Sequence, residues 1–215
     1  KLILSIVALI LSAPAMAVTL KIATVTPNGS QWMADMKAGA KEVKERTEGR
    51  VQIKFYGGGV KGDDAKVLGQ IRIRQLQGGA FTPSALAAQY SDLNLYGMPL
   101  VFDSEEEAAF VRSRMDARLS AGLEEAGFVN FGFATSGFAN IMSATPVRTL
   151  ADLKGKRVWV PEGDNISAQS LKALSLNPVT LPLTDVLTGL QTGLIDIVAI
   201  PPIVALIMQW HTKVK

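Results

Sequence analysis

The sequence contains no cysteine and only one histidine, His211, in 215 residues. Without cysteine there are no disulfide bonds, no thiolate nucleophile and no cysteine-based metal site. One histidine is too few for a histidine-based zinc centre, and no G-x-S-x-G motif supplies a serine nucleophile. We therefore predict no catalytic residues, no metal site and no cofactor, and we interpret His211 as a surface residue.

Neither sign of charge dominates the chain. The 22 basic and 19 acidic residues give a net charge of +3, and they are interspersed, so we predict no nucleic-acid partner. The longest apolar stretch of the C-terminal half, Leu194–Trp210, is interrupted by Asp196 and by Pro201-Pro202. A charge and two prolines disfavour a membrane span. We predict a buried strand, then a helix that begins at the prolines, and no stable membrane insertion.

Residues 1–17 have the pattern of a signal peptide. Lys1 is their only charge, Leu2–Leu11 is mostly apolar, and Ala15-Met16-Ala17 fits the small-x-small cleavage pattern. The apolar core is shorter than the roughly 20 residues that a spanning helix needs. We predict export to the periplasm and a mature chain that begins at Val18.

The C-terminal third has the rhythm of a parallel sheet. Apolar runs at Arg157–Val160, Pro178–Leu181 and Leu194–Ile200 alternate with helical stretches, the last of them Thr184–Gln191. This βαβαβ order predicts an α/β fold with helices on the faces of the sheet. Ligands of such sheets bind beyond the carboxyl ends of the strands, where the run Pro161-Glu162-Gly163-Asp164 stands.

The N-terminal part also alternates strands and helices, and we expect a chain crossover near Gly132–Gly137. The predicted helices are Gln31–Glu48, Asp63–Gln75 and Ser104–Ala126. The predicted strands are Thr19–Thr24, Val51–Tyr56, Gly78–Phe81, Phe128–Ala134 and Asn140–Ala144.

Two local motifs allow two interpretations each. Gly57–Gly62 matches the G-x-G-x-x-G pattern of dinucleotide-binding folds, but Asp63 and Asp64 stand where a phosphate would bind, which favours a glycine-rich turn. Glu162 and Asp164 lie two residues apart after a strand. They could bind a cation or a ligand amine, or they could cap the helix that begins near Asn165.

Six stretches of the chain resemble the substrate-binding subunits of tripartite ATP-independent periplasmic (TRAP) transporters, the DctP-type family. They are Glu45–Val51, Tyr56–Asp64, Ile71–Phe81, Met98–Phe102, Leu150–Pro161 and Leu187–Asp196. The resemblance implies a type II-like periplasmic binding protein with βαβ lobes, lobe 1 at 18–132 and lobe 2 at 133–215. Members of the family are usually longer, so it also implies that lobe 2 is incomplete.

The function that the resemblance implies is the capture of a small organic solute and its delivery to a TRAP membrane permease. Two alternatives are a periplasmic enzyme on a similar α/β scaffold and a ligand-sensing fragment without transport.

The sequence departs from the family at the positions expected to bind a carboxylate. Trp159 and Ala139 stand where many members have arginine, and Ile200 stands where they have asparagine. Neither tryptophan nor alanine can replace the planar fork of arginine. We expect weak binding of C4 dicarboxylates and better binding of a neutral, amine-bearing or metal-bridged ligand.

The predicted ligand-binding residues form an apolar and a polar group. Apolar or stacking contacts are predicted for Phe81, Phe138 and Trp159, and polar contacts for Asn140, Glu162 and Asp164. In the alternative arrangement, Trp159 packs in the core and Arg72 or Arg74 holds a carboxylate.

Overall fold

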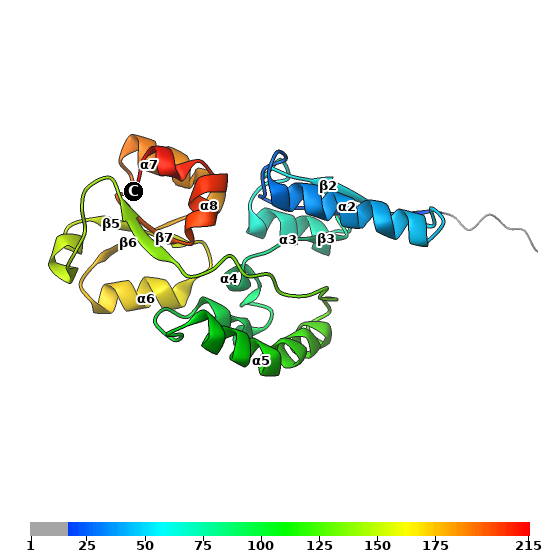
Figure 1. The fold of residues 1–215 in the computed structure, drawn as a ribbon, viewed down its shortest axis with the longest axis horizontal. Coiled ribbons are helices and arrows are strands. Elements are labelled where there is room, and N and C mark those ends of the chain that lie inside the picture. Colours follow the sequence, from blue (N-terminus) through cyan, green and yellow to red (C-terminus); the bar gives the residue numbers. More distant parts are fainter. Residues whose placement is uncertain (1–16) are drawn as a thin grey trace, which may run out of the picture.

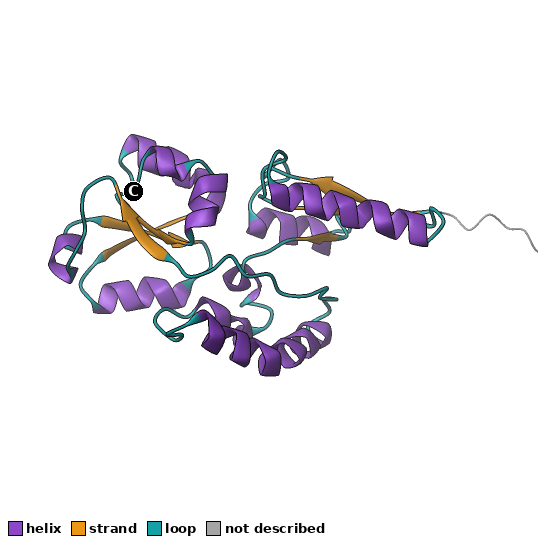
Figure 2. Ribbon diagram, viewed as in Figure 1, coloured by secondary structure: helices purple, strands orange, loops and turns teal. Residues whose placement is uncertain are grey.

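A computed structural model describes residues 17–215. Its strands form two separate sheets, which lie in two lobes with helices around each (Figures 1 and 2). The α/β fold class and the two-lobed architecture are confirmed. The predicted signal peptide lies outside the described residues except for Ala17.

The first lobe contains a three-stranded parallel sheet in the order β2-β1-β3. Its elements are β1 (Val18–Ala23), α2 (Gln31–Arg46), β2 (Val51–Tyr56), α3 (Asp64–Arg72) and β3 (Gly78–Gly79). Ser30 is the N-cap of α2, and its Oγ accepts a hydrogen bond from the Met33 backbone N–H at 3.2 Å. The core of this lobe is small and centres on Ala23, Val67 and Leu76.

The second lobe contains a four-stranded sheet in the order β4-β7-β5-β6. Strand β5 runs parallel to β6 and β7, and β4 runs antiparallel to β7. The elements are β4 (Asn140–Ser143), β5 (Arg157–Pro161), α6 (Asn165–Ala173), β6 (Asn177–Leu181), α7 (Val186–Thr192), β7 (Ile197–Ile200) and α8 (Pro202–Ile207). The predicted βαβαβ order is therefore confirmed.

The helix predicted to follow the paired prolines is present, since α8 begins at Pro202. Its neighbour Trp210 is fully buried and packs edge-on against Trp159, with ring centroids 5.3 Å apart. Residues 194–210 thus contribute a strand and a short helix to the core of the second lobe. In the part of the chain from residue 17 onward, no helix combines the length and the apolar character needed to cross a bilayer.

Helices α4 (Pro83–Leu86) and α5 (Glu105–Glu125) form a third group with the 3-10 helix Ser91–Gly97. Figure 1 shows this group below the space between the two sheets. Leu93, Leu119 and Leu123 form its core. Gly122 of α5 lies so close to Tyr90 that a Cβ atom would overlap the tyrosine ring.

The strand predicted at Phe128–Ala134 is wrong. The segment has no regular secondary structure, and within residues 17–215 no strand pairs with it. A strand needs a neighbour to pair its backbone groups, so the alternating pattern alone is not enough. The side chain of Phe131 is 93% exposed, and the segment carries the chain from α5 to β4.

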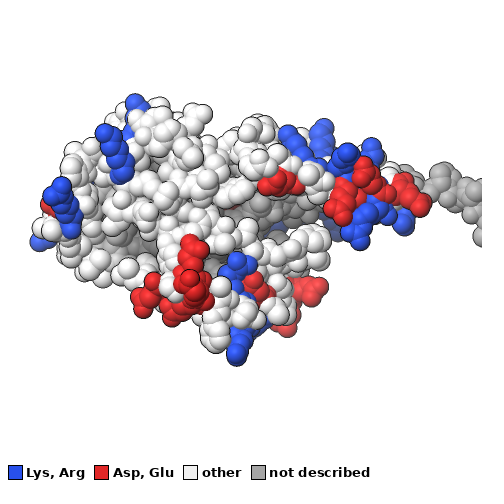
Figure 3. Space-filling model, viewed as in Figure 1, with Lys and Arg blue, Asp and Glu red and all other residues white. Residues whose placement is uncertain are grey.

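Charged side chains of both signs are mixed over the first lobe and sparse over the visible face of the second (Figure 3). On this face, the two signs of charge are therefore interspersed in space over the first lobe only (Figure 3).

Candidate functional site

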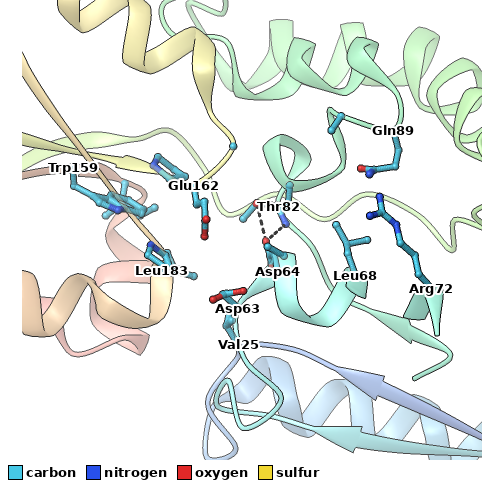
Figure 4. Close-up of a pocket in the computed structure, with 17 residues that line it drawn as sticks. Val25, Asp63, Asp64, Leu68, Arg72, Thr82, Gln89, Trp159, Glu162 and Leu183 are labelled. Carbon is cyan, nitrogen blue, oxygen red and sulfur yellow. Dashed lines mark hydrogen bonds between the residues drawn. The ribbon is translucent and has the colours of Figure 1, made fainter. Parts of the chain in front are cut away.

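A cavity of about 360 Å³ opens between the two lobes. This volume is within the range of roughly 300–1,000 Å³ that is usual for small-molecule sites. Its wall comes from the start and face of α3, from the segment that includes α4, and from the carboxyl ends of β5, β6 and β7 (Figure 4). The lining residues are Val25, Asp63, Asp64, Ala65, Leu68, Arg72, Thr82, Ala85, Ala88, Gln89, Trp159, Pro161, Glu162, Gly163, Pro182, Leu183 and Ile200.

Asp63 provides the N-cap of α3. Its Oδ1 accepts a hydrogen bond from the Lys66 backbone N–H at 2.9 Å, and its Oδ2 lies 3.2 Å from the Lys66 ammonium. Burial opposes ionisation of Asp63, but the hydrogen bonds and the charge of Lys66 outweigh burial and lower the pKa of Asp63. Asp63 is therefore an ionised carboxylate that already has a cationic partner.

Asp64 is held at the cavity wall by Thr82. Its Oδ2 accepts hydrogen bonds from the Thr82 hydroxyl at 2.9 Å and from the Thr82 backbone N–H at 3.2 Å. Burial raises the pKa of Asp64, the bonds from Thr82 lower it, and the nearby charges of Asp63 and Glu162 add to the rise. The net rise means that the cavity destabilises the charge of Asp64.

Glu162 and Asp164, which the sequence placed together, have different positions. Glu162 directly follows β5 and lines the cavity, and Figure 4 shows its side chain extending toward Asp63 and Asp64. Asp164 caps α6, because its Oδ1 accepts a hydrogen bond from the Ser167 backbone N–H at 2.9 Å. Asp164 is not among the residues that line the cavity.

Trp159 belongs both to the core and to the cavity wall. It is 3% exposed, its indole N–H donates to the Leu181 carbonyl at 2.9 Å, and it packs on Trp210. One side of Trp159 also lines the cavity. The core position named in the alternative arrangement is therefore observed, and the role of Trp159 as a ligand contact stays a prediction.

The other predicted contacts lie elsewhere. Phe81 packs against the core of the first lobe. Phe138 is 40% exposed in the segment between α5 and β4, and Asn140 pairs with Ile200 at the first position of β4. None of the three lines the cavity, and their roles as ligand contacts stay predictions. Of the two alternative arginines, Arg72 lines the cavity and Arg74 does not.

The sequence did not indicate Thr82 and Gln89 as part of this wall. Thr82 follows the predicted strand Gly78–Phe81, so the rule that ligands bind beyond strand ends could have found it. Gln89 follows α4, a helix too short to produce a periodic pattern. Its side-chain Oε1 is buried and has no hydrogen-bond partner within residues 17–215.

Gly57–Gly62 is a turn between β2 and α3, and the side chain of Asp63 occupies the helix N-terminus where a phosphate would bind. At two points glycine allows the lobes to approach closely. A Cβ at Gly59 would lie 2.9 Å from the Thr184 methyl, and a Cβ at Gly163 would lie 3.2 Å from the Ser84 carbonyl oxygen. The glycine-rich turn therefore contributes to the contact between the lobes.

Residues 22–208 match the protein family described as "Bacterial extracellular solute-binding protein, family 7" (DctP). A solute-binding protein of Chromohalobacter salexigens is 27% identical over 172 residues, which cover 79% of this chain and 50% of that protein. The chain spans about half the length of the curated relatives it matches.

Solved structures of TRAP periplasmic solute-binding proteins share the fold. The protein from Xanthobacter autotrophicus Py2, with bound β-D-galacturonate, has a TM-score of 0.83 at 24% identity, and the match covers 91% of this chain and 66% of that one. The protein from Pseudomonas putida F1, with bound D-glucuronate, has a TM-score of 0.84 at 23% identity and coverages of 92% and 65%. Because the family match extends over most of its length, this chain belongs to the DctP family of bacterial extracellular solute-binding proteins.

Proposed function

We propose that this protein captures a small organic solute in the cavity between its lobes and delivers it to a TRAP-type membrane permease. The observation that carries the proposal is the composition of the cavity wall, to which both lobes contribute strand-end and helix-start residues. A ligand in this position touches both lobes at once and favours the closed arrangement. We include in the proposal that the chain is exported to the periplasm, that the mature chain begins at Val18 and that the lobes divide at residues 132 and 133.

Trp159 and Glu162 are the proposed ligand contacts from the second lobe. The indole of Trp159 is fixed by Leu181 and Trp210, so it can offer an apolar face without loss of side-chain entropy on binding. Glu162 offers a carboxylate directly after the carboxyl end of β5. A wall with one fixed apolar side and a few polar groups is typical of small-molecule sites.

The test of capture is the identification of the solute. We expect native mass spectrometry of the purified protein to show one bound small molecule in one-to-one ratio, and that molecule should raise the melting temperature when added to stripped protein. At a concentration 100 times its Kd a ligand adds about 2.7 kcal/mol to stability. The proposal is contradicted if no molecule co-purifies with the protein and no member of a broad panel of sugars, organic acids and amino acids stabilises it.

A bulky side chain at the contact between the lobes should weaken capture. Thr184 is exposed, and its methyl group faces Gly59 of the first lobe. We expect Thr184→Phe to hold the lobes apart and to reduce solute affinity about tenfold or more, which is about 1.4 kcal/mol. Calorimetry gives the affinity, and small-angle scattering with ligand should show a larger radius of gyration than the wild type.

Thr188→Phe is the matched control for this wedge. Thr188 is also exposed, on α7, but it does not line the cavity. Its substitution should leave affinity and size unchanged. Equal affinities for the two variants would refute a closing motion at this contact.

A further inference from the structure

The cavity is acidic at one end and basic at the other. Figure 4 shows Asp63, Asp64 and Glu162 gathered on one side, while Arg72 and Gln89 face each other on the opposite side. Trp159 and Leu183 lie beyond the acidic group in the second lobe. A solute that spans the cavity therefore meets groups of opposite charge at its two ends.

The acidic end has more negative charge than the protein itself neutralises. Lys66 pairs with Asp63, and Thr82 gives Asp64 only neutral hydrogen-bond donors. Glu162 takes part in no ion pair with any described residue. Asp64 belongs to the first lobe and Glu162 to the second, and their negative charges repel each other across the cavity. A positive group between them would remove this repulsion.

The basic end also has unsatisfied groups. Arg72 likewise forms no ion pair within residues 17–215. The buried Oε1 of Gln89 has no hydrogen-bond donor in the same part of the chain. A ligand carboxylate would give Arg72 the ion pair that it lacks. It donates no hydrogen bond, so it would not satisfy the Gln89 acceptor, and the assignment of this end rests on Arg72.

We propose that the solute captured here is a zwitterion of the amino-acid type, with its ammonium group between Glu162 and Asp64 and its carboxylate against Arg72. This inference rests on the proposed function and specifies the ligand class of the same cavity. An ammonium group donates up to three hydrogen bonds and can serve both carboxylates together. The guanidinium of Arg72 can hold a carboxylate through two parallel hydrogen bonds.

Other solute classes fit the two ends less well. A dicarboxylate would place a negative group beside Glu162 and Asp64, where like charges repel. Within residues 17–215, no group of three or more His, Cys, Asp or Glu side chains could hold a metal ion, which gives no support to a metal-bridged solute. A sugar acid could satisfy Arg72, and its hydroxyl groups would leave the two negative charges in place.

Calorimetry with small probes of defined charge tests this assignment. The probes are a series of ω-amino acids from glycine to 6-aminohexanoate, the α-amino acids, D-glucuronate and succinate. We expect binding by at least one amino acid, and binding at least about tenfold weaker by D-glucuronate and succinate. The amino acid that binds should lose about tenfold or more in affinity when its amine is replaced by a hydroxyl group.

Two variants test the two ends separately. Glu162→Gln should weaken the amino acid about tenfold and should leave D-glucuronate unweakened. Arg72→Gln should weaken the amino acid and any carboxylate alike. The matched controls Glu124→Gln and Arg74→Gln change charges of the same kind outside the cavity wall and should change nothing.

The pH dependence adds an independent readout. The acidic end consists of Asp64 and Glu162, flanked by Asp63 with its partner Lys66. Because burial and the neighbouring charges raise the pKa of Asp64, this group takes up a proton at a higher pH than an ordinary aspartate. Amino-acid affinity should therefore fall as the solution is acidified, and Asp64→Asn should flatten that profile.

Two different failures are possible, and they can be told apart. Tight binding of D-glucuronate or succinate with no amino acid bound would overturn the zwitterion assignment and leave solute capture in place. If Glu162→Gln and Glu124→Gln bind the amino acid equally well, the placement of the ammonium group against Glu162 is overturned and solute capture stays in place. If no probe binds and no molecule co-purifies, both the ligand class and the proposed function are overturned.

Discussion

Replacing Trp159 by alanine is expected to destabilise the protein by about 3–5 kcal/mol, the usual cost of removing a buried tryptophan. The side chain is 3% exposed, and its loss removes the edge-on contact with Trp210 and the hydrogen bond to the Leu181 carbonyl. Trp210 would then border a void in the core of the second lobe. Urea unfolding followed by circular dichroism measures the change.

Two further variants separate packing from other effects of the substitution. Trp159→Phe keeps a ring against Trp210 and should cost less than the alanine variant. Phe131→Ala is the surface control, because Phe131 is 93% exposed, and its change should stay within about 0.5 kcal/mol. A loss of less than 1 kcal/mol in Trp159→Ala, on the order of a surface change, would contradict the core position.

The same substitution is a poor test of ligand binding. Because Trp159 supports the wall and the core together, loss of binding in Trp159→Ala could follow from loss of folded protein. Trp159→Phe is the better variant for calorimetry. Its solute affinity can be compared with that of the wild type at a temperature where both are folded.

Alanine at Gly122 is expected to destabilise the protein by about 1–3 kcal/mol, although alanine is the better helix former. A Cβ at this point of α5 would overlap the ring of Tyr90. The tyrosine belongs to the segment that also carries Gln89 and the α4 wall of the cavity, so the clash would also displace part of the site. Thermal unfolding and solute affinity should both be affected.

Gly39→Ala provides a control with the opposite expected sign. Gly39 lies inside α2, and a Cβ there would have no neighbour within 4 Å. Alanine should therefore stabilise the protein by up to about 1 kcal/mol. The double variant Gly122→Ala with Tyr90→Ala should recover part of the stability that the overlap with the Tyr90 ring costs. Equal changes in stability for Gly122→Ala and Gly39→Ala would disprove the close contact.

Local sequence patterns predicted most of the second lobe. Between Arg157 and Ile200, apolar strand-like runs alternate with helical stretches, and glycine or proline residues mark where these segments end. The paired prolines mark the start of α8. Helix starts were predictable for the same reason, because Ser30, Asp63 and Ser104 each accept a hydrogen bond from a nearby backbone N–H. These features depend on contacts between residues that are close in the chain.

The features that depend on distant contacts were not predictable in this way. The pattern at Phe128–Ala134 is that of a strand, but pairing requires a partner that the pattern does not specify. Glu162 and Asp164 look equivalent in sequence, and only the fold shows that one lines the cavity while the other caps a helix. The meeting of Asp64 with Glu162 joins residues about a hundred positions apart, and no local signal reports it.

The double use of Trp159 bears on how specificity in this cavity can change over evolution. A substitution on the apolar wall alters the core of the second lobe, so a new ligand preference gained there comes with reduced stability. Glu162 and Arg72 are solvent-accessible and outside the core clusters, and exchanging them should leave folding nearly untouched. A change of ligand preference at the charged ends of the cavity therefore costs this protein less stability than a change at Trp159.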